Sequence, residues 1–375
     1  MRKRYFSAPG RVEIGGNHTD HQCGRVLAAA VDLEAAAEVT ANGSGIARLL
    51  SSGFGVQEID LNELEPLAEE KGTPAALVRG VAAWFVKNGY AIGGFDAEVS
   101  SEIPVGEGLS SSAAFEVLIG NIFKGLSGAD VTPVDIAIAG QFAENIYFDK
   151  PCGLMDQTAS SFGGLNMIDF YDPLKPVVTP VKAELTGYSM CLVTAGGSHA
   201  ELTPDYAAIT NEMKTVAAFF GKDYLRELSE NEFISAIGRL RHLGDRAVLR
   251  AIHFFGEDKR VWKQAEALER GDIDEFLGLV IESGRSSLAY LQNVYDPADP
   301  GQQGLTLALA LSERILNGRG AWRIHGGGFA GTILTFVPFD LKETFRREMC
   351  DVFGEGSCRF LNVRKEGGGE KHGGS

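Results

Sequence analysis

The sequence predicts an α+β protein built from two domains, and three observations support this. The chain has 375 residues, 44% of them hydrophobic, which is long enough for one large domain or two. Helix-like and strand-like apolar patterns are mixed along it without a regular βαβ rhythm. A composition shift divides the chain near residues 173–184. We therefore expect an N-terminal domain over residues 1–182, a C-terminal domain over 183–365 and a disordered glycine-rich tail over 366–375.

Apolar spacing predicts the elements of the N-terminal domain. Residues 75–86 have the spacing of a helix, and residues 95–99 alternate like a strand. A second helix covers about 110–126. A third covers about 132–146, where a Thr-Pro pair suits the N-cap and the first turn. Residues 165–170 have the pattern of a strand after a Gly-Gly pair.

The C-terminal domain begins with a β-rich run and continues with helices. Residues 188–194 are rich in strand-forming side chains. Three helical stretches follow near 205–220, 231–255 and 273–291. Residues 321–337 contain two apolar strands around a glycine-rich turn.

Charge and composition exclude several classes of protein. The formal net charge is -15 and no cluster of Lys and Arg stands out, so we do not expect a nucleic-acid partner. No run of 18 apolar residues predicts a membrane span, and no apolar segment follows the basic N-terminus as in a signal peptide. Five cysteines without CxxC spacing are typical of reduced thiols, so we expect a cytoplasmic protein. If a chain this acidic binds phosphate, the negative charge of the phosphate must be offset at the site by backbone N–H groups, a metal ion or an arginine.

The first candidate for chemistry is the glycine- and serine-rich segment 104–113. Glycines let the backbone approach a ligand closely, and serines at a helix start supply hydroxyls. A helix N-terminus attracts phosphate through its N–H groups and its dipole. An ordinary capped helix after a glycine turn is an equally good interpretation. The segment is not a Walker A loop, because no Gly-Lys-Ser/Thr follows.

Two carboxylates form the second candidate. Glu144 ends a predicted helix, and Asp156 follows within the sequence Cys-Gly-Leu-Met-Asp-Gln. One carboxylate could hold Mg²⁺, and the other could orient or deprotonate a hydroxyl nucleophile. Taken alone, these residues favour a simpler interpretation, a solvated helix charge and a turn-capping aspartate.

Near the N-terminus, an arginine precedes a polar cluster. Arg11 is a fixed positive charge that could face a developing phosphoryl charge. Asn17, His18 and Asp20 could form directional hydrogen bonds with sugar hydroxyls. A zinc site from His18, Asp20 and His21 is less favoured, because ligands so close in an irregular loop rarely converge.

A triple glycine lies within residues 323–332 and could let the backbone touch a ligand or another loop. A hairpin turn is the simpler interpretation. His-Gly-Gly-Gly also resembles the oxyanion-hole loop of some esterases, but the G-x-S-x-G elbow that such enzymes need does not occur in the sequence.

Together these segments resemble the GHMP kinase superfamily, and within it the galactokinase family, over about residues 7–364. Each motif is weak alone, but their combination and order are specific. The motifs are Pro-Gly-Arg-Val at 9–12, Gly-Asn-His-Thr-Asp at 16–20, Gly-Glu-Gly-Leu-Ser-Ser-Ser-Ala at 106–113, Cys-Gly-Leu-Met-Asp-Gln at 152–157 and Gly-Gly-Gly-Phe-Ala-Gly at 326–331.

The resemblance implies an ATP- and Mg²⁺-dependent sugar 1-kinase with two α+β domains and the active site between them. It implies that Asp156 acts on the anomeric hydroxyl, that Arg11 stabilises the transferred phosphoryl group, and that Ser110 and Glu144 hold Mg²⁺. The implied sugar-binding residues are Asn17, His18, Asp20, Gly153 and Tyr206. The implied ATP-binding residues are Arg79, Gly106, Glu107, Gly108, Leu109, Ser110, Ser111 and Ser112.

The chain departs from the galactokinase pattern beside the sugar-binding residues. Asn17 stands where Glu is usual, Glu13 where Asn is usual, and His21 where Tyr is usual. These departures therefore concern the choice of substrate rather than the reaction. We expect galactose 1-phosphate and ADP as products, with N-acetylgalactosamine, arabinose or a uronic acid as competing candidates for the substrate.

Two further hypotheses change the class of protein rather than the sugar. One is a non-catalytic sensor of ATP and sugar, and the second is a different GHMP branch such as a mevalonate or homoserine kinase. The intact serine segment disfavours the sensor, and the polar cluster near the N-terminus favours a sugar. We expect the sugar and ATP as ligands, no nucleic acid or membrane as partner, and a monomer or weak homo-oligomer.

Overall fold

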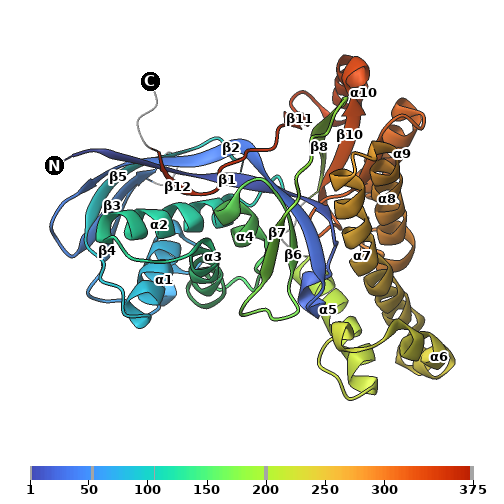
Figure 1. Ribbon diagram of the computed structural model, residues 1–375, viewed down its shortest axis with the longest axis horizontal. Coiled ribbons are helices and arrows are strands. Elements are labelled where there is room, and N and C mark those ends of the chain that lie inside the picture. The colour runs from blue at the N-terminus through green and yellow to red at the C-terminus, as the bar shows by residue number, and fades with distance from the viewer. Residues whose placement is uncertain (1, 52–54, 105, 198–201, 372–375) are drawn as a thin grey trace. The chain divides into compact units, whose positions relative to one another are not determined.

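The computed structural model describes residues 2–51, 55–104, 106–197 and 202–371, which form two compact units (Figure 1). Unit 1 comprises Met1–Arg11, Ala29–Gly164 and Val363–Ser375, and unit 2 comprises Val12–Ala28 and Leu165–Asn362. The units are interleaved in the sequence, whereas composition predicted consecutive segments that meet near residue 182. The interleaving arises because strands β1 (Arg4–Gly15) and β2 (Arg25–Ala41) each contribute residues to both units.

Unit 1 is a mixed sheet with its helices on one face (Figure 1). Its strands pair in the order β12-β1-β2-β5-β3-β4, and β3 runs antiparallel to β4 but parallel to β5. The remaining strands are β3 (Ile46–Ser51), β4 (Gly55–Asp60), β5 (Phe95–Ser101) and β12 (Gly369–Lys371). The helices are α1 (Pro74–Lys87), α2 (Ser111–Ser127), α3 (Pro133–Phe142), the π-helix η3 (Ala143–Phe148), α4 (Met155–Phe162) and the 3₁₀ turn η2 (Ala68–Glu70).

The core of unit 1 lies between this sheet and the helices. Phe95 of β5 packs edge-on against Phe123 of α2, with 5.6 Å between ring centroids, and Phe85 of α1 lies 5.8 Å from the same ring. All three rings are buried. Along β5 the side chains alternate, so that Asp96 and Glu98 are exposed on the opposite face. The period of two in the sequence therefore sets the two faces of the sheet.

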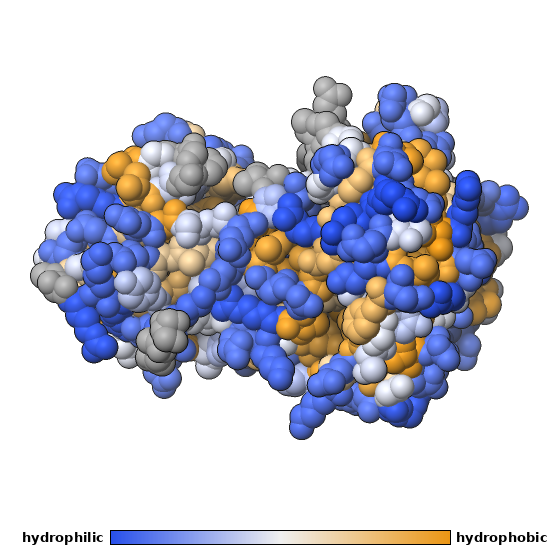
Figure 2. All heavy atoms as spheres, turned by 90° about the horizontal axis from the view of Figure 1, so that it is seen from above, coloured by the Kyte–Doolittle hydropathy of each residue, from blue (hydrophilic) through white to orange (hydrophobic). Residues whose placement is uncertain are grey.

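The opposite face of the sheet carries a mixture of charged and apolar side chains. Figure 2 views the molecule from above relative to Figure 1 and shows hydrophobic patches among hydrophilic side chains. Tyr5, Leu50 and Val56 are exposed large side chains of this unit. A groove of about 680 Å³ contains none of the predicted site residues. Its lining residues are Tyr5, Phe6, Ala36, Ala37, Glu38, Leu50, Ser51, Glu98, Val99, Ser100 and Lys371.

The glycine-rich C-terminal segment is ordered where the sequence predicted disorder. Gly369–Lys371 form β12, which pairs antiparallel with β1. The N–H of Gly368 donates to the carbonyl of Ser160 (2.9 Å). A Cβ at Gly367 would lie 2.1 Å from the carbonyl oxygen of Ser161, so the close approach requires glycine. The prediction of a disordered tail is therefore wrong for residues 369–371, and residues 372–375 lie outside the described part of the chain.

Unit 2 contains an antiparallel sheet in the order β11-β8-β10-β9. These strands are β8 (Tyr188–Gly196), β9 (Ala321–Ile324), β10 (Gly331–Pro338) and β11 (Cys358–Leu361), and β6 (Leu165–Asp169) pairs with β2 and with β7 (Val177–Pro180). The helices are α5 (Thr203–Phe219), α6 (Glu230–Leu240), α7 (Asp245–Glu269), α8 (Ile273–Ser286), the π-helix η6 (Ser287–Leu291), α9 (Gly304–Leu316) and α10 (Lys342–Phe353). The 3₁₀ turns are η1 (Asp20–Gln22), η4 (Leu225–Glu227), η5 (Arg241–Leu243) and η7 (Phe339–Leu341).

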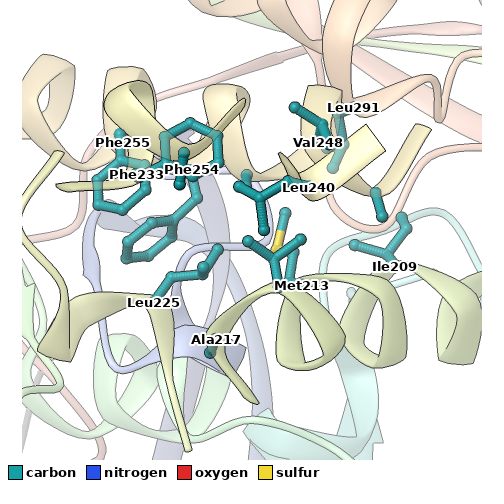
Figure 3. Close-up of a cluster of buried hydrophobic side chains, with 14 of the residues drawn as sticks. Ile209, Met213, Ala217, Leu225, Phe233, Leu240, Val248, Phe254, Phe255 and Leu291 are labelled. Carbon is teal, nitrogen blue, oxygen red and sulfur yellow. The ribbon is translucent and has the colours of Figure 1, made fainter. Parts of the chain in front are cut away.

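A large apolar cluster joins α5, α6 and α7, and its side chains point toward one another (Figure 3). Met213 of α5 and Leu240 of α6 are fully buried in it. Phe233 of α6 stacks on Phe255 of α7 with 5.0 Å between ring centroids. This packing supports the long helix α7, which also carries residues of the candidate site.

Most predicted elements of the sequence are present with small shifts at their ends. The predicted helix over 231–255 is wrong as one element, because Gly244, with φ of +106°, separates α6 from α7. The helices α9 and α10 were not predicted. No helix of the described residues is long and apolar enough to cross a membrane.

Candidate active site

In unit 1, the glycine- and serine-rich segment forms a turn that leads into α2. Gly106 and Gly108 have φ of +82° and +77°, in the left-handed region that glycine adopts freely. Ser110 is the N-cap of α2 and is also left-handed, with φ of 55°, which costs a non-glycine residue about 1–3 kcal/mol. Its side chain does not cap α2 but donates a hydrogen bond to Asp156. The start of α2 therefore keeps the anion-binding character of an uncapped helix N-terminus.

The remaining loop residues support this turn. Leu109 is buried, and its carbonyl accepts a hydrogen bond from the backbone N–H of Arg11 (3.3 Å). Glu107 is half-buried in the turn, and Ser111 is half-buried at the first position of α2. Residues 106–111 of the predicted segment thus form a turn attached to β1, and Val105 lies outside the described residues.

Arg11 and Asp156, far apart in the sequence, form an ion pair beside this loop. The Arg11 Nε donates to Asp156 Oδ1 (2.7 Å), and Nη1 donates to the carbonyl of Gly108. Burial raises the pKa of Asp156, but the charge of Arg11 and the hydrogen bonds from Arg11 and Ser110 outweigh it and lower the pKa below its usual range. Asp156 is therefore an ionised hydrogen-bond acceptor at neutral pH.

Glu144 is the second carboxylate and is buried in the π-helix η3. Its Oε1 accepts hydrogen bonds from Ser112 Oγ (2.9 Å) and Lys150 Nζ (2.7 Å), and its Oε2 accepts one from Gln157 Nε2 (3.0 Å). The hydroxyl that contacts Glu144 is therefore that of Ser112, whereas Ser110 contacts Asp156. That Ser110 and Glu144 hold Mg²⁺ stays a prediction.

The oxygen atoms at Glu144 suit a hard cation such as Mg²⁺. Among the described residues, no group of three or more His, Cys, Asp and Glu side chains could hold a metal ion. Mg²⁺ commonly binds proteins through one or two carboxylates and otherwise through substrate phosphates and water. The residues around Glu144 therefore fit Mg²⁺ that arrives with a phosphate ligand.

A third carboxyl group, that of Glu116 in α2, is connected to Glu144 through the side chain of Gln157. Gln157 Nε2 donates to Glu116 Oε2 (2.9 Å) as well as to Glu144. Burial, together with the charge of Glu144, raises the pKa of Glu116 well above its usual value. Glu116, Gln157 and Lys150 were not predicted from the sequence, although a glutamate within the apolar stretch of α2 was a usable signal.

Gly153 and Arg79 occupy different environments. Gly153 is half-buried in the loop before α4, which Asn145 holds by accepting a hydrogen bond from the N–H of Cys152 (2.7 Å). Arg79 of α1 is buried and pairs with Glu70 through Nε and Nη2 (both 2.7 Å). Its Nη1 donates to the backbone carbonyl of Glu63. Because these contacts engage the guanidinium within the protein, they give no support to the prediction that Arg79 binds ATP.

In unit 2, Asn17 is buried and hydrogen-bonded on every side by protein groups. Its Nδ2 donates to Glu13 Oε1 (3.1 Å) and to the carbonyl of Gly326 (2.7 Å). Its Oδ1 accepts from Asn293 Nδ2 (2.9 Å) and Ser287 Oγ (3.3 Å). These contacts connect the polar cluster to the glycine-rich loop, and sugar binding by Asn17 stays a prediction.

A buried ion pair adjoins Asn17. Arg323 of β9 donates from Nη2 to Glu13 Oε1 (2.7 Å) and from Nη1 to the Glu13 carbonyl (2.9 Å). The Arg323 side chain is 0% exposed and that of Glu13 is 5% exposed. Two of the departures from the galactokinase pattern, Glu13 and Asn17, are thus in direct contact with each other.

Glu257 of α7 holds the backbone of the same segment. Its Oε1 accepts from the N–H of Gly16 (3.0 Å) and from Ser283 Oγ (2.6 Å). Burial raises the pKa of Glu257, but the neighbouring charge of Arg260 outweighs it and lowers the pKa to about 2. His253 Nε2 contacts the carbonyl of Asn17 (2.9 Å). The ionised carboxylate of Glu257 therefore holds the backbone of the polar cluster within unit 2.

His18 is held in one protonation state by its surroundings. Burial lowers its pKa to about 3, so the ring is neutral at pH 7. Its Nε2 lies 2.9 Å from the carbonyl of Gly327, which can only accept, so Nε2 carries the proton. Nδ1 is buried and has no hydrogen-bond partner among the described residues. It is therefore a lone-pair acceptor suited to a ligand hydroxyl.

Asp20 and His21 lie in the turn that follows His18. Asp20 Oδ1 accepts from the N–H of His21 (2.9 Å). The rings of His18 and His21 are 5.2 Å apart between centroids. Asp20 is half-buried and therefore lies near the surface. One oxygen of its carboxylate is already hydrogen-bonded to the backbone.

Tyr206 of α5 packs on the triple-glycine loop. Its hydroxyl donates to the carbonyl of Gly328 (2.9 Å), and burial raises its pKa to about 12, so it remains protonated. A Cβ at Gly327 would lie 2.4 Å from the Tyr206 ring. The triple glycine thus lets His18 and Tyr206 approach the same backbone, which agrees with the prediction that it touches another segment of the chain.

Comparisons with known proteins give a consistent result. The chain matches the family described as GHMP kinases N terminal domain over residues 76–164, and the galactokinase galactose-binding signature over residues 2–41. A galactokinase of Glaesserella parasuis serovar 5 is 30% identical over 353 residues, covering 92% of this chain and 88% of the relative. A Haemophilus influenzae galactokinase is 31% identical over 351 residues, with the same coverage.

Solved structures agree with these relatives. Lactococcus lactis galactokinase complexed with galactose has a TM-score of 0.84 and 26% identity, covering 99% of this chain and 95% of that chain. Methanococcus jannaschii mevalonate kinase has a TM-score of 0.68 and 16% identity, covering 96% and 98%. The second likeness concerns the fold alone.

Proposed function

The chain belongs to the galactokinase family, and from this premise we propose that it transfers the γ-phosphoryl group of ATP to the anomeric hydroxyl of galactose. The products are galactose 1-phosphate and ADP. The observation that carries the proposal is the contact of Arg11 and Ser110 with Asp156, which keeps a carboxylate ionised beside a glycine-rich helix start. The matched galactose-binding signature supports galactose as the sugar.

Asp156 and Arg11 are the proposed catalytic residues. Asp156 accepts a hydrogen bond from the anomeric hydroxyl, directs its oxygen at the γ-phosphorus and receives its proton as transfer proceeds. The lowered pKa makes Asp156 a weak base, which favours orientation over early deprotonation. Arg11 holds Asp156 in place and stabilises negative charge on the transferred group.

The phosphates and the metal are assigned to the loop and to Glu144. The backbone of residues 106–112 and the start of α2 hold the triphosphate. Glu144 and Ser112 would hold Mg²⁺, whereas Ser110 orients Asp156. When bound, Mg²⁺ neutralises charge on the phosphate oxygens.

The sugar is assigned to His18, Asp20 and Gly153. His18 accepts a hydroxyl hydrogen through Nδ1, and Asp20 accepts another through its carboxylate. Asn17 and Tyr206 position this cluster by fastening it to the triple-glycine loop.

An ADP-release assay tests the proposal. Wild-type protein with Mg²⁺ and ATP should turn over with galactose, and Asp156→Asn should lose about 10²- to 10⁴-fold in kcat, because the amide cannot accept the proton. Nucleotide affinity should change little. Arg11→Lys should also lose turnover, because a fork of donors becomes a point charge. Near-normal turnover of Asp156→Asn would contradict the assigned role.

A second candidate keeps the reaction and changes the sugar. The buried, fully bonded amide of Asn17 favours it, because that side chain is not available to the sugar as the usual glutamate would be. The same assay with N-acetylgalactosamine, arabinose, glucuronate and mevalonate identifies the preferred substrate. Binding of ATP and sugar without turnover would instead support a sensor.

We also propose that the protein acts in the cytoplasm, where ATP is available, as a monomer or weak homo-oligomer. All five cysteines are free thiols, which agrees with a reducing compartment. Sedimentation of the purified protein would determine its oligomeric state.

A further inference from the structure

Lys150 approaches Glu144 from the solvent side of unit 1. Its N–H donates to the backbone carbonyl of Glu144 (3.1 Å), which fixes the main chain of the loop between η3 and α4. Its ammonium donates to Glu144 Oε1 (2.7 Å). The Lys150 side chain is 59% exposed, whereas that of Glu144 is 2% exposed. The backbone is therefore held while the side chain can turn on its flexible stem.

The Glu144 oxygen that Lys150 contacts is the one that faces the start of α2. Glu144 Oε1 also accepts from Ser112 at the start of α2, whereas Oε2 faces the buried amide of Gln157. A divalent cation on Oε1 would take the lone pair that Lys150 now uses and would repel the ammonium group. Binding of Mg²⁺ with its nucleotide would thus release Lys150 from Glu144.

The neighbouring carboxyl groups do not offer the released ammonium an equivalent partner. Asp156 is already paired with Arg11 and accepts a hydrogen bond from Ser110. Glu116 is buried and lies behind Glu144. A phosphate at the start of α2 would be a new anion within the reach of a lysine stem. Unit 1 belongs to a strongly acidic protein, so a triphosphate there needs local positive charge beyond the metal.

We propose that Lys150 is a phosphate-binding residue of the nucleotide site, which exchanges Glu144 for the triphosphate when the metal-bound nucleotide arrives. This inference rests on the proposed function. Lys150 then has two states, one on the protein carboxylate and one on the ligand, and its charge offsets part of the phosphate charge in the second.

Calorimetric titration with Mg²⁺ and a non-hydrolysable ATP analogue, without sugar, tests the exchange independently of turnover. Lys150→Met should weaken nucleotide binding by about tenfold or more, because a charge-assisted hydrogen bond is lost. Lys150→Arg should retain most of the affinity. Raising the salt concentration should reduce the difference between wild type and Lys150→Met.

Lys71→Met is the matched control, because Lys71 is an exposed lysine of unit 1 that pairs with Asp149 (3.0 Å) next to Lys150 in the sequence. Its affinity should equal that of the wild type. Equal or tighter nucleotide binding by Lys150→Met would overturn the inference. That result is expected if Lys150 only competes with the metal for Glu144 and makes no contact with the phosphates. Wild-type protein that binds no nucleotide would instead refute the proposed function, so the two failures are distinguishable.

Discussion

Replacement of Arg323 by Met should destabilise unit 2 by about 3–5 kcal/mol, because it leaves a buried carboxylate without its cation. The Glu13 side chain is only 5% exposed, so water has little access to it in place of the lost charge. Two hydrogen bonds to Glu13, at 2.7 and 2.9 Å, disappear in the same step. Since domains are stable by about 5–15 kcal/mol, the loss is a large fraction of the total.

Thermal unfolding followed by circular dichroism measures this effect. For a unit of about 200 residues each kcal/mol lowers Tm by about 2–4 °C, so Arg323→Met should lower it by about 6–20 °C. The double variant Glu13→Gln with Arg323→Met should recover much of the loss, because the uncompensated charge is gone. Arg285→Met, which breaks an exposed pair with Glu313, should change Tm by about 2 °C or less.

Unfolding of Arg323→Met within about 2 °C of the wild type, or a double variant no more stable than the single one, would refute the predicted cost of an unpaired Glu13 charge. Either result would mean that water or a conformational adjustment compensates Glu13. Recovery of stability in the double variant would show that Glu13 and Arg323 depend on each other. Glu13 and Asn17, the two departures from the family pattern, would then belong to one buried hydrogen-bond network with Arg323.

Three further predictions concern pH, the metal and the glycine loop. Because Glu257 has a folded pKa of about 2, below its unfolded value of about 4.3, its stabilisation is fully present above that value and is lost as pH falls toward 2. Glu257→Gln should therefore flatten Tm against pH in this window, and an unchanged slope would contradict it. Ser112→Ala should raise the Mg²⁺ concentration needed for half-maximal ADP release, whereas Ser110→Ala should lower kcat at saturating Mg²⁺; the reverse pattern would favour Ser110 as the metal ligand. Gly327→Ala should raise KM for the sugar more than KM for ATP, because its Cβ would strike the ring of Tyr206, and equal KM changes would argue against this.

The sequence predicted the parts of the fold that local chemistry determines. The helix predicted over 75–86 appears as α1 and the strand over 188–194 as β8, because apolar spacing is a property of neighbouring residues. The order of Gly369–Lys371 could not be predicted, because it depends on pairing with the distant strand β1 and on the contact of the preceding Gly368 with α4. Glycine-rich composition alone is equally typical of a flexible tail.

The candidate site was predictable in its residue types but less so in its contacts. Arg11 and Asp156 were both identified, yet their ion pair joins residues 145 positions apart. Asn17 was assigned to the sugar because amides bind hydroxyls, but burial against Asn293 and Gly326 satisfies it within the protein. Lys150 has no sequence signal that separates it from other surface lysines.

The position of the phosphate in the product tests the central claim most directly. Wild-type protein would be incubated with Mg²⁺, ATP and galactose, and the sugar product examined by phosphorus and carbon NMR. We predict phosphate on the anomeric carbon, which is galactose 1-phosphate, formed with an equal amount of ADP. Phosphate on another carbon, or ADP released without a phosphorylated sugar, would contradict the account.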